Sequence, residues 1–550
     1  MTISKTLCLV TAALVITNCA PSKPEMKTQE KPTISAADIG RRIETLADDR
    51  FEGRAPGTNG GLMASQYIAD EMKAADIAPM GIEGTYFQPI TLTETTVSDG
   101  SYMKIGATNY TAGKDAVYWT KHYQDSVTVS DSDLVFVGYG VVAPEYGWND
   151  YAGVDVKGKT VVMLVNDPGF ATKDEKLFKG NAMTYYGRWT YKFEEAGRQG
   201  AAGVLVIHET EPASYGWNVV SGGWTGPQID LIRPDKGASR STLEGWLTID
   251  SAKDLFKTAN LDFAALKSAA SQKGFKPVPM DGLKLNAQIN NTISTVKSRN
   301  VVGVVKGTKY PDEYVLYMAH WDHKGIKTVA EGEDGIYNGA VDNATGTSAI
   351  LEIGEAFAVA PAERSVLIVA VTAEESGLLG SAYYGEDPIV PLNKTVAGIN
   401  VDGMLPLGRT KDVVVVGYGA SELDGLLEAV VKPRGMYLIP DPKPEAGYYY
   451  RSDHISLAKK GVPFLYADAG IDHETKGKEY GTWFGDDYTA NRYHAPSDEY
   501  DNSWDLSGIE QMTEIFYELG NGIANSRDWP NWNETAEFRS LRDEMMKQSD

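Results

Sequence analysis

The sequence predicts an α/β fold built on a mostly parallel sheet with helices on both faces. The first indication is a set of four apolar, β-branched runs, typical of strands buried on both faces, at residues 300–306, 314–319, 365–371 and 395–401. The second is that helical patterns separate the later runs, one of them with Ile350, Ile353 and Phe357 on a single face. Such alternation indicates a parallel sheet covered by helices, where ligands bind at the carboxyl ends of the strands.

Composition narrows the class of protein. A chain of 550 residues is expected to form two or three domains, and 42% apolar with 23% charged residues is ordinary for a globular protein with a sizeable core. The net charge of −23 argues against a nucleic-acid-binding surface and against electrostatic docking on anionic lipid.

The N-terminus resembles an export signal. Residues 1–19 combine Lys5 with an apolar run at 7–16 that is too short to span a membrane. Cys19 is placed like the lipidated residue of bacterial lipoproteins, although Asn18 stands where a small residue is preferred. We expect an exported bacterial protein, periplasmic or anchored in the outer membrane through Cys19, with plain secretion as the alternative. The only other cysteine is Cys8, so the mature body has no disulfide.

Changes in amino-acid composition and in the hydrophobic pattern predict the domain boundaries. Residues 20–33, rich in Lys, Glu and Pro, read as a tether. Helices are expected at 34–47, with Ser35 as N-cap, and at 62–75. From residue 126 short strands and a helix form a module of their own. We therefore predict a main domain made of residues 34–125 and 286–525, an insert at 126–285, and a C-terminal tail at 526–550.

Titratable side chains follow the buried strands of the main domain. His320-Trp321-Asp322-His323 follows the strand at 314–319, Glu374-Glu375 follows that at 365–371, and Asp402 follows that at 395–401. A Glu pair alone could be a solvated loop, since Glu is usually exposed. Repeated acidic and imidazole groups at strand ends are harder to dismiss, because burying such charge without a cation is costly.

The order of these motifs resembles a known family, the co-catalytic dizinc exopeptidases, which include bacterial leucyl aminopeptidases and glutamate carboxypeptidases. The resemblance covers roughly residues 35–120 and 290–525, and the insert looks like the protease-associated domain that some members carry. The motifs that carry it are His320-x-Asp322, Asp342-Asn343-Ala344, Glu374-Glu375, Asn400-Val401-Asp402-Gly403, Ser452-Asp453-His454 and Tyr493-His494.

The resemblance implies two Zn²⁺ ions with one shared ligand. His320, Asp342 and Asp402 would bind one ion. Asp342, Glu375 and His494 would bind the other. Imidazole and carboxylate ligands suit zinc. The resemblance assigns no metal to His323 or His454. We expect each of them to lie in the core or to contact a metal ligand without binding metal itself.

It also implies the roles around the metals. Glu374 would be the general base on a zinc-activated water, and Asp322 would orient His320. Tyr449 or Tyr450 would donate to the oxyanion. Arg451 is a candidate substrate-binding residue.

We therefore expect a metallo-exopeptidase that hydrolyses N-terminal residues from peptides. A carboxypeptidase of the same fold is an alternative, in which Arg451 would bind the substrate carboxylate. Two further alternatives are a single-zinc glutaminyl cyclase and a non-catalytic, receptor-like relative, and the complete ligand set argues against both. Peptide is the only substrate class implied, and the sequence does not indicate an oligomeric state.

Overall fold

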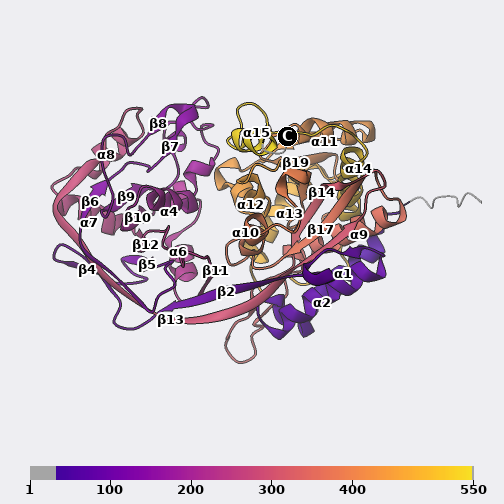
Figure 1. Cartoon of the computed structure of the whole chain (residues 1–550), viewed down its shortest axis with the longest axis horizontal. Helices are drawn as coiled ribbons and strands as arrows, with labels where there is room; N and C mark the ends of the chain where they lie inside the picture. The colour runs from indigo at the N-terminus through magenta and orange to yellow at the C-terminus, as the bar shows by residue number, and fades with distance from the viewer. Residues whose placement is uncertain (1–31, 548–550) are drawn as a thin grey trace, which may run out of the picture.

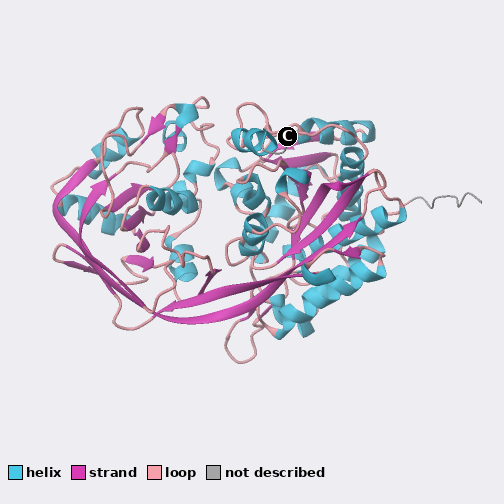
Figure 2. Ribbon diagram, in the orientation of Figure 1, coloured by secondary structure: helices cyan, strands magenta, loops and turns pink. Residues whose placement is uncertain are grey.

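Two lobes joined by a long two-stranded ribbon make up the computed structural model, which describes residues 32–547 (Figures 1 and 2). The predicted signal peptide, Cys19 and all but the last residues of the predicted tether lie outside the described residues. Among residues 32–547, every helix is too short or too polar to span a bilayer.

The larger lobe contains the predicted parallel sheet. Its centre is four parallel neighbours: β17 (Arg364–Val371), β14 (Tyr310–His320), β18 (Thr395–Asn400) and β21 (Phe464–Ala469). Antiparallel strands flank this centre, with β13 (Val278–Val305) against β17 and β19 (Asp412–Val416) against β21. At the far edge, β20 (Tyr437–Pro440) runs parallel to β19. The mostly parallel sheet predicted from the four apolar runs is confirmed.

Helices cover both faces of this sheet. Successive residues of a strand point to opposite sides, so strands that are apolar throughout need an apolar cover on each face. In β14, Val315 and Tyr317 pack into one apolar cluster, and Leu316 and Met318 into another. The helices of the first face are α1 (Ala36–Leu46), α2 (Asn59–Ala74), α9 (Gly346–Val359), α11 (Leu423–Val431) and α14 (Ser507–Ala524). Those of the second include α10 (Leu379–Glu386), α12 (His454–Ala458) and α15 (Arg539–Lys547). Each fully buried aliphatic side chain stabilises the fold by about 1.5–3 kcal/mol.

Strand β13 joins the lobes. Its second half pairs with β2 (Phe87–Val97), and its first half pairs with β6 (Ser126–Phe136) and β3 (Tyr102–Ile105) of the smaller lobe. That lobe has its own sheet, with β6, β9 (Thr160–Leu164), β10 (Gly203–Ile207), β12 (Leu243–Leu247) and β5 (Ala116–Trp119) as neighbours in that order. Helices α4 (Trp189–Arg198), α7 (Ile249–Thr258) and α8 (Phe263–Ala270) complete it. Its short strand β11 (Gln228–Leu231) pairs with β2 of the connecting ribbon.

The insert begins earlier than the predicted residue 126. Strands β3, β4 (Thr108–Tyr110) and β5 pair within the smaller lobe's sheet, so this lobe starts just after β2. The sequence does not predict this boundary, because short alternating strands have the same pattern in either sheet. Only their pairing partners show to which lobe they belong.

The C-terminal segment is also part of the larger lobe rather than a tail. The Trp532 indole donates to Gly461 O at 3.0 Å, and the buried Arg542 donates to Thr395 O at 3.0 Å. Two long-range anchors of this kind leave no periodic pattern in the sequence, which is why the sequence predicts a tail here.

Candidate metal and active site

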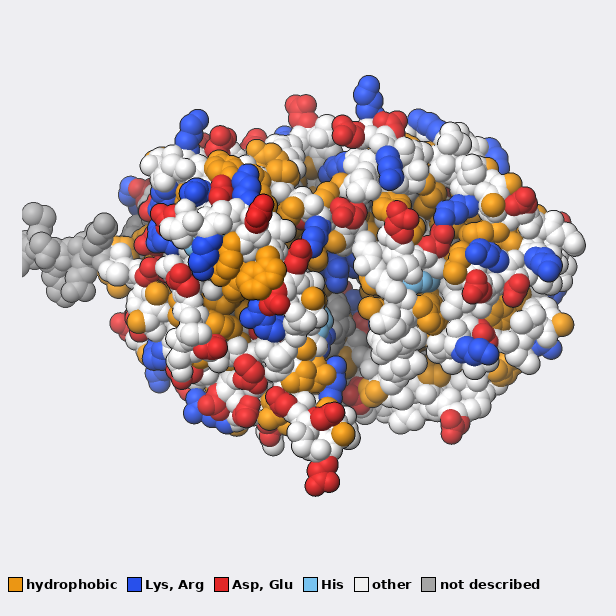
Figure 3. All heavy atoms as spheres, turned by 180° about the vertical axis from the view of Figure 1, so that it is seen from behind, with side chains coloured by type: hydrophobic (Ala, Val, Ile, Leu, Met, Phe, Trp, Pro, Cys, Tyr) orange, Lys and Arg blue, Asp and Glu red, His pale blue; other side chains and the backbone are white. Residues whose placement is uncertain are grey.

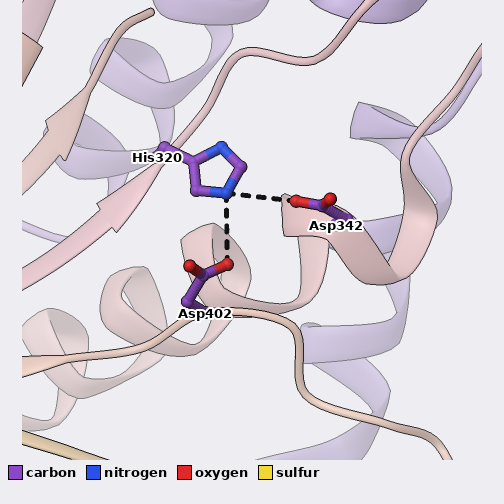
Figure 4. Close-up of side chains that lie close together, drawn as sticks. All are labelled: His320, Asp342 and Asp402. Atoms are coloured by element: carbon purple, nitrogen blue, oxygen red, sulfur yellow. Dashed lines mark hydrogen bonds and ion pairs between the residues drawn. The ribbon is translucent and has the colours of Figure 1, made fainter. Parts of the chain in front are cut away.

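The carboxyl ends of neighbouring strands bring His320, Asp342 and Asp402 together (Figure 4). His320 is the last residue of β14, and Asp402 lies two positions beyond β18. The His320 Nε2 atom lies 3.1 Å from Asp342 Oδ1 and 3.2 Å from Asp402 Oδ1. Ser452 Oγ donates to the other oxygen of Asp402. The first predicted ligand group therefore exists as a spatial cluster.

Asp342 is held in place by Asp498. Residue 342 lies in a distorted turn, residues 340–345, that leads into α9. The two carboxylate oxygens of Asp498 accept the N–H groups of Val341 at 3.0 Å and Asp342 at 3.1 Å. The Tyr488 hydroxyl donates to Asp498 at 3.2 Å. This fixes the backbone from which the Asp342 side chain projects, a role for Asp498 that the sequence analysis did not assign.

A second group forms on the other side of Asp342. The His494 Nε2 atom lies 3.1 Å from Asp342 Oδ2 and 3.2 Å from Glu375 Oε2. His323 Nδ1 lies 2.6 Å from Glu375 Oε1, so His323, Asp342 and Glu375 also form a candidate metal-binding group. His323 was predicted to hold no metal. The structure buries it and places it in direct contact with Glu375, a predicted ligand.

Glu374 and Glu375 have different surroundings although they are adjacent. Glu375 contacts two histidines and the Lys324 ammonium, which lies 2.7 Å from its Oε2. Among residues 32–547, the Glu374 carboxylate forms no ion pair of this kind, and it lines the cleft described below. Burial raises the pKa of Glu374 well above its ordinary value, against the opposing effect of His320. A carboxyl group with a raised pKa at the edge of a site is suited to moving a proton.

Asp322 orients His320 through its backbone. The His320 Nδ1 atom lies 3.1 Å from the carbonyl oxygen of Asp322, but 3.9 Å from its carboxylate. The carboxylate instead accepts the N–H of Glu374 at 3.1 Å. A bond from Nδ1–H to the carbonyl leaves Nε2 free to face the acidic groups. Asp322 therefore fixes both His320 and the loop that carries Glu374.

The donor set fits divalent metal ions. Asp342, Glu375 and Asp402 bring three carboxylates against the imidazoles of His320 and His494, with His320 and Asp342 buried. Carboxylates this close repel one another unless cations lie between them. Nitrogen and oxygen donors without thiolates suit zinc among other metals.

The segment that carries these residues matches a known family model. Residues 300–520 match the model of Peptidase family M28. This segment includes every predicted metal ligand, Glu374 and Asp498. The first part of the chain, with α1, α2 and most of the insert, lies outside the matched residues.

Proteins similar to this chain include some named glutamate carboxypeptidases and some named aminopeptidases. A probable glutamate carboxypeptidase of Arabidopsis thaliana is 26% identical over 415 residues, which cover 68% of this chain and 50% of that protein. An aminopeptidase of Bacillus subtilis is 36% identical over 104 residues, 18% of this chain and 19% of that protein. The chain thus spans about half or less of these curated relatives. Among solved structures, an aminopeptidase from an Aneurinibacillus strain covers 91% of this chain and 95% of its own, with 20% identity and a TM-score of 0.49.

Among the described residues, neither the Tyr449 nor the Tyr450 hydroxyl forms a hydrogen bond with a predicted metal ligand. Tyr449 packs against the ring of His454 at 4.8 Å, within an apolar cluster. The Tyr450 hydroxyl donates to Glu537. Tyr450 and Tyr493 both line the cleft described below, but only Tyr493 of these two stacks on the ring of His494, at 3.8 Å. The sequence does not show in which direction the turn Tyr448–Tyr450 points its rings, although these residues precede the Ser-Asp-His motif. Tyr493 could have been found, because it is adjacent to the predicted ligand His494.

A cleft of about 570 Å³ lies between the lobes and contains the predicted base. From the larger lobe it is lined by Glu374, Glu375, His494 and Arg451, and from the insert by Arg188 and its neighbours. Seen from behind, the molecule is hollowed between its two halves (Figure 3). The predicted ligands Glu375 and His494 therefore face a space whose other wall is the insert.

Proposed function

We propose that this chain is a zinc-dependent exopeptidase that releases N-terminal residues from peptides. The observation that carries the proposal is the position of Asp342, whose two oxygens face His320 on one side and His494 on the other, each at 3.1 Å. A carboxylate shared in this way supports two ions rather than one. Two zinc ions bound there would activate a water molecule as the nucleophile.

Side chains of this chain would move the proton. Glu374 takes it from the attacking water and passes it to the leaving amine, since it is the one acid of the Glu pair without a histidine in contact. Tyr493, stacked on His494, is placed to donate a hydrogen bond to the oxygen that becomes negative in the transition state. Asp322 and Asp498 hold the groups in position.

The N-terminal end of the peptide is favoured by the local sequence. Ser452-Asp453-His454 with a preceding Arg resembles the aminopeptidase branch, and residues 334–342 contain no arginine. The relative with the higher identity of the two reported above is named an aminopeptidase. The second candidate is a carboxypeptidase, favoured by Arg451 in the cleft and by the longer match to a probable glutamate carboxypeptidase.

For location, we propose export followed by lipidation at Cys19, on the strength of the N-terminal pattern alone. The insert, which resembles a protease-associated domain in sequence, would form the outer wall of the site.

The test is hydrolysis combined with metal analysis. Purified protein is expected to hold close to two zinc ions per chain and to release N-terminal residues from short peptides. Removing metal with a chelator should abolish turnover, and added zinc should restore it. A protein with two bound ions and no hydrolysis of free or N-acetylated peptides would favour the receptor-like alternative, and one ion with full activity would rule out the shared-ligand site.

A further inference from the structure

An acid that the proposed mechanism does not use lies at the end of β21. In this strand Tyr466 pairs with Asn400 of the parallel neighbour β18. Two residues further along each chain segment stand Asp468 and Asp402, so these acids occupy matching positions at the carboxyl ends of adjacent strands. Adjacent strands lie about 4.8 Å apart. Asp468 therefore stands next in the row of strand ends that carries the predicted metal ligands.

Asp468 has no partner for its charge. Its Oδ1 atom is shielded from solvent and accepts no hydrogen bond, and its carboxylate forms no ion pair within residues 32–547. Burial and the like charges of Asp402 and Asp441 raise the pKa of Asp468 well above its ordinary value, and no described cation offsets them. A shielded carboxylate is costly without donors or a positive charge. A cationic group on a ligand would supply both.

The surroundings of Asp468 are apolar and aromatic. Its partner across the antiparallel pair is Val414 of β19, which belongs to the same apolar cluster as Tyr449 and Tyr466. Tyr466, two residues before Asp468, points to the same side of the sheet. Aromatic rings attract cations, and apolar walls pack against an aliphatic stem. The group that fits beside Asp468 is therefore a cation at the end of an aliphatic chain.

There is room for a ligand group beside Asp402. The next residue is Gly403, and no described atom outside its chain neighbours lies within 4 Å of the position that a Cβ would take there. The Asp402 side chain keeps 16% of its surface exposed, and Tyr466 and Asp468 are also partly exposed. These side chains therefore border an accessible space rather than a closed core.

The position of Glu374 determines which part of a peptide would lie beside Asp468. The sheet places β17, β14, β18 and β21 side by side in that order, and their carboxyl ends lead to Glu374, His320, Asp402 and Asp468 respectively. In the proposed mechanism Glu374 gives a proton to the leaving amine. The leaving peptide then extends past the end of β17 into the cleft, and the N-terminal residue lies on the opposite side, toward β18 and β21.

We propose that Asp468 binds the cationic side chain of an N-terminal lysine or arginine, so that the enzyme prefers peptides with a basic first residue. Ammonium and guanidinium groups form charge-assisted hydrogen bonds with a carboxylate. This inference rests on the proposed peptidase activity and names its substrate class. The α-ammonium group is common to all unblocked peptides and stays near the metals, so Asp468 distinguishes one side chain from another.

The experiment compares substrates whose N-terminal side chains differ in charge. Lysine p-nitroanilide is paired with norleucine p-nitroanilide, which has the same aliphatic chain without the ammonium group. Arginine p-nitroanilide is paired with citrulline p-nitroanilide, its neutral analogue. Each is assayed with the wild type, Asp468→Asn and the control Asp472→Asn. Asp472 follows the same strand, but its carboxylate already accepts the Tyr437 hydroxyl at 3.0 Å.

For the wild type we expect kcat/KM to be about tenfold or more higher for the charged member of at least one pair, through a lower KM. Asp468→Asn should remove that preference through a loss on the charged substrate, with zinc content unchanged, because the amide keeps the size of the carboxylate without its charge. Asp472→Asn should retain the preference. Which pair responds shows whether an ammonium or a guanidinium group fits.

Three results would overturn the proposal. The first is equal kcat/KM within both pairs for the wild type. The second is an equal loss on every substrate in Asp468→Asn, which would mean that Asp468 acts on the metals or on the α-ammonium group. The third is the same loss of preference in Asp472→Asn, which would assign the effect to the overall charge of the region.

Binding separates this proposal from the proposed activity. Lysinol and norleucinol are amino alcohols that cannot be hydrolysed, and their calorimetric titration into zinc-loaded protein needs no turnover. If no substrate is cleaved, the proposed function fails, and tighter binding of lysinol, lost in Asp468→Asn, would still support the cation site. Equal binding of the two amino alcohols to the wild type would contradict it, whether or not peptides are hydrolysed.

Discussion

Asp342 Oδ2 lies 3.1 Å from His494 Nε2, although β17, β18 and α13 (Gly477–Asn491) separate the two residues in the chain. The other oxygen of the same carboxylate faces His320. Asp342 is thus the one residue common to both groups of ligands, and its position depends on a turn that Asp498 holds from behind. A single substitution at residue 342 should affect both groups together.

Asp342→Ala is expected to weaken both metal sites and to remove most activity. Each site would lose one of its carboxylates, and the remaining acids would be less able to hold a divalent ion. Zinc content by elemental analysis should fall from close to two per chain to well below one. The control Asp70→Ala, at an exposed position on α2, should keep full zinc content. Retention of one tightly bound ion in Asp342→Ala would show that the two sites are independent.

Glu374→Gln is expected to retain the fold, the metals and substrate binding but not turnover. The amide has the size of the carboxyl group and cannot accept the proton from the attacking water. We expect kcat to fall by about 100-fold or more, the usual effect of losing an acid–base group. The measurement is steady-state kinetics beside zinc analysis of the same preparation. Near-normal kcat would mean that another group moves the proton.

The sequence predicted which strand-end residues lie together better than it predicted the residues that hold them in place. Strand ends can be predicted because apolar runs stop where His320, Glu374 and Asp402 begin, and neighbouring parallel strands must bring such residues to one edge. The role of Asp498 could not be predicted, because it binds backbone N–H groups that have no sequence signature.

Asp498→Asn is expected to lower metal affinity rather than the intrinsic rate. Its amide group can no longer accept both the Val341 and Asp342 N–H groups, so the turn carrying Asp342 would loosen. Residues that hold a metal ligand in place without binding the metal typically change metal affinity by about 10–100-fold when they are mutated. Activity measured against zinc concentration should therefore shift to higher zinc and recover at saturation. Asp501→Asn, which removes only a local contact to Ser503, is the control. Loss of kcat that saturating zinc does not restore would contradict this positioning role.

Cys19→Ser tests the proposed anchor. If Cys19 is lipidated, the wild type should fractionate with membranes, and the serine variant should become soluble, because the attached chains supply the membrane affinity. Fractionation of an expressing bacterium followed by immunoblotting measures both. A wild type already soluble in the periplasm or medium would identify an ordinary secretory signal.

The last prediction concerns which end of the peptide is cleaved. An aminopeptidase must receive an α-ammonium group near the metals, where Glu374 and Glu375 supply negative charge, and an acetylated N-terminus cannot provide it. The net charge of −23 also favours a cationic N-terminus over an acidic substrate, although salt screens this effect. We expect release of the N-terminal residue from short peptides and no cleavage of their N-acetylated forms, measured by mass spectrometry of the products. Equal rates on free and acetylated peptides, with loss of the C-terminal residue, would reverse the assignment and make Arg451 the clamp of a carboxypeptidase.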